Sequence, residues 1–136
     1  MFWRQLTAPE INAVDRKIPV VLPLAAIEQH GPHLPVETDS RIAEGFCAAT
    51  DALDPQRALF LPVQTIGCSE HHLDLGGSLS LTHEAWLASV ESIASSVFQQ
   101  DFKTLVLFNA MAAIRPSAKS RWRKSAVGMP TSRSLS

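Results

Sequence analysis

Largely apolar runs along the chain alternate with stretches whose apolar positions recur every three to four residues. Residues 18–26, 58–63 and 104–108 are continuous runs of aliphatic and β-branched residues without polar alternation. That pattern is typical of strands buried on both faces, as in a parallel sheet. The sequence therefore predicts three buried strands.

Helical patterns precede and separate these strands. Thr7 and Glu10 form a capping-box pattern that predicts a short first helix. Asp39 or Ser40 is the expected N-cap of a second helix, and Thr82 that of a third. The second helix is expected to bury Ile42, Phe46, Ala49 and Leu53, and the third to bury Trp86, Leu87, Val90, Ile93, Ala94, Val97 and Phe98.

The order strand, helix, strand, helix, strand predicts an α/β fold with right-handed crossovers. We expect three layers, α/β/α, around a mostly parallel sheet that is incomplete at its C-terminal end. Residues 1–110 are assigned to this domain and residues 111–136 to a basic, Ser-rich tail. Ligands of such sheets bind at the carboxyl ends of the strands, so the three loops there are expected to carry the chemistry.

Composition and charge limit the class of protein. The chain has 136 residues, 46% of them hydrophobic, which fits one globular domain. Its apolar runs are too short to span a bilayer, and no secretory signal is recognised. Cys47 and Cys68 have no paired spacing, so reduced thiols and a cytoplasmic location are expected.

The loop after the first strand carries the strongest chemical signal. It reads Glu-Gln-His-Gly-Pro-His-Leu-Pro from Glu28, and Asp39 follows at a helix start. Residues two apart in an extended segment point the same way, so Glu28 and His30 can face one site that Asp39 joins. Two carboxylates and an imidazole suit Zn²⁺ or Mn²⁺, in a one-metal or two-metal site. The alternative is a solvated polar loop.

The stretch from Leu22 to Asp39 resembles the signature of the creatininase family of metal-dependent amidohydrolases. The resemblance implies that Glu28 and His30 bind different metal ions, that Asp39 bridges the ions, and that His33 supports the ligands. It also implies hydrolysis of a cyclic or linear amide, such as creatinine, by a homo-oligomer.

The loop after the second strand is similar to the family's Glu-His, spacer, Pro-Gly-Thr pattern. His72 takes the family's histidine position, and Gly76 stands where proline is usual. His72 is interpreted as a contact to the substrate or a support of the metal site. The alternative, equally weighted, is a loop histidine bonded to the backbone.

The third loop departs from the family pattern, Asn-Gly-His-Gly-Gly-Asn. Asn109 is in place, but Met111 occupies the histidine position, and a thioether is a poor ligand in an oxygen-rich site. With one base restored upstream, the codons of residues 110–114 permit Ala-His-Gly-Gly-Asn. Our hypothesis is a single-base deletion near the Ala110 codon, which makes the following residues an unselected tail.

The charge distribution agrees with that hypothesis. All 13 acidic residues lie at or before Asp101, whereas seven of the 12 basic ones lie from Lys103 onward. The rival interpretation is a nucleic-acid-binding tail with the cluster Arg121, Trp122, Arg123 and Lys124. Three functions therefore remain: a metal-dependent amidohydrolase that contacts neither nucleic acid nor membrane, a non-enzymatic fragment with a partial divalent-metal site, and the basic-tailed module.

Overall fold

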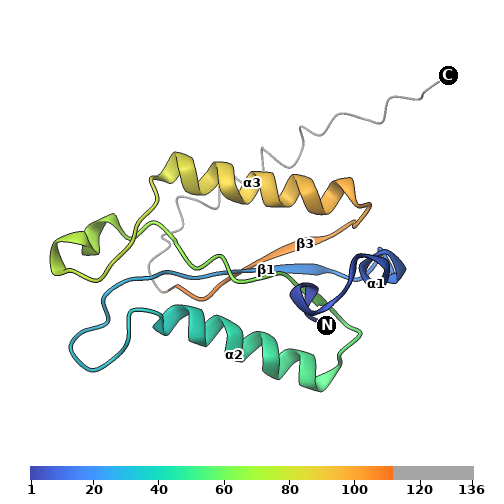
Figure 1. Cartoon of the computed structure of the whole chain (residues 1–136), viewed down its shortest axis with the longest axis horizontal. Helices are drawn as coiled ribbons and strands as arrows, with labels where there is room; N and C mark the ends of the chain where they lie inside the picture. The colour runs from blue at the N-terminus through green and yellow to red at the C-terminus, as the bar shows by residue number, and fades with distance from the viewer. Residues whose placement is uncertain (112–136) are drawn as a thin grey trace.

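The computed structural model of the chain describes residues 1–111, and in it two long helices enclose a parallel sheet (Figure 1). The strands β1 (Val20–Leu24), β2 (Leu59–Phe60) and β3 (Leu105–Asn109) lie in the spatial order β2-β1-β3. Helix α2 (Thr38–Leu53) covers one face of the sheet and α3 (His83–Gln99) the other. The predicted three-layer α/β arrangement is confirmed.

Shorter elements connect these layers. They are the 3-10 helices η1 (Trp3–Gln5) and η2 (Glu70–Leu75) and the helix α1 (Ala8–Ala13). The predicted tail lies outside the described residues from residue 112 onward, so the domain boundary at residue 110 stays a prediction. Among residues 1–111, no helix has both the length and the apolar character needed to cross a membrane.

Strand β1 is the centre of the sheet and fixes where its following loop begins. Val20 lies opposite Leu59 of β2 and Leu105 of β3. Strand β2 covers only Leu59–Phe60 and is shorter than the predicted run 58–63. Beyond Pro62 the hydrogen bonding to β1 resumes with its register shifted by one residue. Leu24 lies opposite Gln64, and Gln64 N donates to Pro23 O at 2.9 Å.

The core lies mainly between the sheet and α3. Val90 and Val97 of α3 are buried against β1 residues, and Thr82 Oγ1 accepts from Ala85 N as the predicted N-cap. The predicted stripe of α3 is thus confirmed at its centre. The buried members of this core are Val20, Leu22, Leu24, Leu59, Leu61, Val90, Val97 and Phe102.

Two predictions for α2 are wrong. The helix begins at Thr38 after an N-cap at Glu37, which puts Asp39 inside the first turn. The face expected to be buried is also exposed: the exposed fraction is 59% for Phe46 and 87% for Leu53. The buried face is instead formed by Asp39, Ser40, Ala43 and Cys47. Small side chains on this face let α2 lie close to the sheet, which larger residues would prevent.

Candidate metal centre

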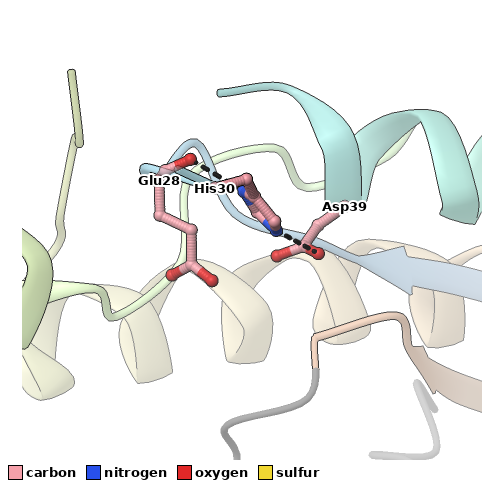
Figure 2. A group of neighbouring side chains, drawn as sticks. All are labelled: Glu28, His30 and Asp39. Atoms are coloured by element: carbon pink, nitrogen blue, oxygen red, sulfur yellow. Dashed lines mark hydrogen bonds and ion pairs between the residues drawn. The ribbon is translucent and has the colours of Figure 1, made fainter. Parts of the chain in front are cut away.

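Three candidate ligands lie together beyond the carboxyl end of β1 (Figure 2). Glu28 and His30 come from the loop after β1, and Asp39 comes from the first turn of α2. Each offers one ligand atom, and these atoms all lie within 4.8 Å of one another. Glu28 and Asp39 are buried and His30 is half-buried. The structure therefore brings the three predicted donors to one place.

The hydrogen bonds of His30 orient its ring toward Asp39. Nδ1 lies 2.9 Å from the main-chain oxygen of Glu28. A carbonyl oxygen only accepts, so Nδ1 carries the proton, and Nε2 of the neutral ring presents a lone pair. Nε2 lies 3.3 Å from Asp39 Oδ1. The bond to the Glu28 carbonyl, followed by the attraction of the Asp39 carboxylate, raises the pKa of His30.

Asp39 carries an oxygen without a hydrogen-bond partner. Burial raises the pKa of its carboxyl group, and the nearby Glu28 carboxylate acts in the same direction. Asp39 Oδ2 is buried and accepts no hydrogen bond from any residue within 1–111. An unpaired buried acceptor is costly, so this oxygen is poised to bind a cation.

In the described part of the chain, no lysine or arginine balances the two carboxylates. Within residues 1–111, neither Glu28 nor Asp39 forms an ion pair with a lysine or an arginine. Two acidic oxygen donors and one imidazole nitrogen are a ligand set that Zn²⁺ and Mn²⁺ accept. The donors and the local charge thus fit a divalent cation.

The loop that carries Glu28 is held from both sides. Leu79 N donates to Ile27 O at 2.9 Å, and Glu28 N donates to Val36 O at 3.1 Å. Glu28 is therefore clamped between the chain before Asp39 and the strand-like segment before α3. Gly31 turns the loop with a φ of +73°, a backbone conformation that favours glycine.

His72 contacts the loop after β1 through Gln29 and not through the three candidate donors. Gln29 Nε2 lies 3.1 Å from His72 Nδ1, and Gln29 N donates to Ser78 Oγ at 3.0 Å. These bonds connect the loop after β1 to the loop after β2, next to the candidate donor Glu28. The role of His72 in contacting substrate stays a prediction.

The structure does not bring His33 to the donor group. Its side chain is exposed and, within the described part of the chain, makes no hydrogen bond. Support of the ligands by His33 stays a prediction. Met111 is buried and packs on Gly67, where an added Cβ would lie 2.9 Å from its Sδ. It is not one of the three clustered donors.

Sequence reasoning missed a set of serines around Glu28. The Ser69 hydroxyl donates to Glu28 Oε2 at 2.6 Å, and Ser69 N donates to Ser80 Oγ at 2.9 Å. The alternation Ser78-Leu79-Ser80-Leu81 was the available signal, because residues two apart in an extended segment face the same way. No local pattern marked Ser69 itself.

The fold and the donor cluster define an α/β protein with a candidate metal centre at the end of its central strand. The profile of the creatininase family, described as creatinine amidohydrolase, matches residues 4–113. The chain belongs to the creatininase family.

Individual relatives agree with this assignment. A mycofactocin precursor peptide peptidase of Mycobacterium tuberculosis is 35% identical over 74 residues, which cover 48% of this chain and 30% of the peptidase. A manganese form of creatininase superposes with a TM-score of 0.75 at 21% identity, and a Zn–Zn form of a creatininase variant with 0.74 at 21%. Each of these two comparisons covers 93% of this chain and 54% of the creatininase.

At 21% identity, the likeness to the solved creatininases shows that the fold is shared. The chain spans about half the length of the solved creatininases that it matches.

Proposed function

We propose that the chain binds Zn²⁺ or Mn²⁺ through Glu28, His30 and Asp39 and serves metal-dependent hydrolysis of an amide C–N bond. The strongest support is the convergence of the three donors around an Asp39 oxygen that lacks a hydrogen-bond partner. Asp39 Oδ1 faces His30 while Oδ2 is free, so this carboxylate can serve two ions, with Glu28 on one and His30 on the other.

The residues of the chain have separate roles in this proposal. When bound, a divalent cation acidifies water and polarises a carbonyl oxygen. Glu28 and Asp39 provide the negative charge that holds the cation. The Nδ1 bond of His30 to the Glu28 carbonyl keeps Nε2 directed at the site, so little ring freedom is lost on binding.

The proposed substrate class is a small cyclic or linear amide or a peptide. The relatives carry the names creatininase and precursor peptide peptidase, and both names describe cleavage of an amide bond. Association of copies is also proposed, because β3 has a neighbouring strand on one side only within residues 1–111.

A second candidate function is divalent-metal binding without turnover. It is favoured by the count of donors, because three ligands complete a single four-coordinate ion only with water and cannot fill two shells. Met111 also favours binding without turnover, because it stands at the family's histidine position and a thioether is a poor ligand in an oxygen-rich site.

Calorimetric titration of the chelator-treated full chain with Zn²⁺ and with Mn²⁺ tests metal binding. Glu28→Gln, His30→Gln and Asp39→Asn should each raise Kd at least about tenfold, because each removes one ligand. The exposed His83 of α3 provides the matched control, and His83→Gln should leave Kd within about twofold. Absence of binding to the unmodified chain overturns the proposal.

Assays on creatinine, formamides and a short peptide separate the two candidates. Two bound ions with turnover that Asp39→Asn abolishes support the hydrolase. One weakly bound ion without turnover supports the binding function.

A further inference from the structure

Ser69 lies behind the candidate metal centre, on the loop between β2 and η2. Its side chain is fully buried, and its hydroxyl donates to Glu28 Oε2 at 2.6 Å across 41 positions of sequence. A hydrogen bond to a charged acceptor is short and stronger than one between neutral groups. Ser69 is therefore the side chain that holds the buried Glu28 carboxylate.

The direction of this bond is fixed by its acceptor, the Glu28 carboxylate. Ser80 Oγ accepts from Ser69 N at 2.9 Å and donates to Leu81 O at 3.1 Å. A carboxylate only accepts, so the single hydroxyl proton of Ser69 points at Glu28. Ser80 does not compete for that proton, because its Oγ bonds the main-chain N–H of Ser69 and not the hydroxyl.

The two carboxylate oxygens of Glu28 differ in their hydrogen bonding to Ser69. Oε2 is occupied by the Ser69 hydroxyl, which leaves Oε1 with all its lone pairs for another partner. Within the described residues, Glu28 has no lysine or arginine partner that could orient it instead. Loss of the Ser69 hydroxyl would let the carboxylate rotate away from His30 and Asp39.

We propose that Ser69 is a positioning residue, which orients Glu28 as a ligand through the hydrogen bond of its hydroxyl to Oε2. The inference rests on the proposed metal binding by Glu28. Ser69 is not a nucleophile in this arrangement, because it is fully buried and donates its proton to a carboxylate. Polar partners of metal ligands typically contribute 10- to 100-fold to affinity.

The test compares three variants of the full chain by calorimetric Zn²⁺ titration and by the visible spectrum of the Co²⁺ form. Ser69→Ala should raise the Zn²⁺ Kd about 10- to 100-fold and change the Co²⁺ spectrum. Ser69→Thr keeps the hydroxyl and should stay within about threefold of the unmodified chain. Ser80→Ala removes a half-buried hydroxyl that bonds the main-chain N–H of Ser69 and not Glu28, and it should also stay within about threefold.

The outcomes separate this inference from the proposed function. If the unmodified chain binds no Zn²⁺, metal binding itself is wrong. If Glu28→Gln weakens binding but Ser69→Ala does not, Ser69 has no positioning role. Equal losses in Ser69→Ala and Ser80→Ala mean a general packing effect and also overturn the inference. If Ser69→Ala does not fold, Ser69→Thr decides, because weak binding by a folded threonine variant contradicts the proposal.

Discussion

Gln29 Nε2 lies 3.1 Å from His72 Nδ1 and ties the loop after β1 to the loop after β2. The orientation of the Gln29 amide follows from its other end, where Oε1 accepts from Gly31 N at 3.0 Å. Nε2 of the amide only donates, so His72 Nδ1 must accept. The neutral His72 ring therefore carries its proton on Nε2, where it can serve as a donor.

The first prediction concerns this tautomer. Nitrogen chemical shifts from long-range ¹H–¹⁵N spectra should report an Nε2–H ring for His72 at a pH where it is neutral. In Gln29→Glu the new carboxylate accepts from the ring, so the proton should move to Nδ1. His72→Ala assigns the signals, because the resonances lost in that variant belong to His72. An Nδ1–H ring in the unmodified chain is the result that contradicts the contact.

The second prediction concerns the stability that a bound metal adds. A ligand that binds only the folded chain stabilises it, by about 2.7 kcal/mol at a free concentration 100 times its Kd. Zn²⁺ should therefore raise the midpoint of thermal unfolding, and a chelator should reverse the effect. Asp39→Asn removes the charge of a buried carboxylate and should lose this response. A Zn²⁺-induced shift that survives in Asp39→Asn would place the cation elsewhere.

The third prediction concerns the pair of glycines in the loop after β2. Gly77 has a φ of +72°, and an added Cβ would lie 3.1 Å from Val36 Cγ1. Gly77→Ala should lower the free energy of unfolding by about 1–2 kcal/mol, because left-handed backbone is strained for other residues. Gly45→Ala is the matched control, since nothing lies within 4 Å of its Cβ position in α2. That variant should be more stable by about 0.5–1 kcal/mol, as measured in urea.

The fourth prediction concerns the pH dependence of stability at α1. The Glu10 carboxylate accepts from Thr7 N and Thr7 Oγ1, both at 2.7 Å, and these bonds lower the pKa of Glu10. A carboxyl group with a lowered pKa stabilises the folded chain above its ordinary pKa of 4.5, and this contribution is lost as pH falls below it. The unmodified chain should have a higher urea midpoint than Glu10→Gln at pH 7, and the difference should vanish near pH 2. A constant difference across that range contradicts the capping role.

The sequence predicted those features that arise from local periodicity. The α3 stripe around Val90 and Val97 repeats at helical spacing, and Glu28 and His30 lie two apart after a buried strand, so both followed from the chain alone. The buried face of α2 did not. The helical spacing of the apolar residues Ile42, Phe46, Ala49 and Leu53 predicted the wrong face, because the helix packs through the smaller Ala43.

Contacts between distant loops could not be predicted from local patterns in the sequence. Ser69 reaches Glu28, and Gln29 reaches His72, through the meeting of two loops that no local period encodes. Gly76 shows the same limit. Its φ of +75° is closed to proline, the residue that is usual at this position of the family pattern.

The central place of β1 has a consequence for the order in which the chain folds. Val20 pairs with Leu59 and with Leu105, both synthesised much later, so its hydrogen bonds close long loops. Long-range pairing of this kind slows folding. The contacts that hold Glu28 also form late, because Ser69 and Leu79, which bonds to Ile27, are synthesised after it. A nascent chain of residues 1–60 thus contains all three candidate ligands but lacks the contacts from Ser69 and Leu79, so the proposed metal site should form only after residue 79 has been synthesised.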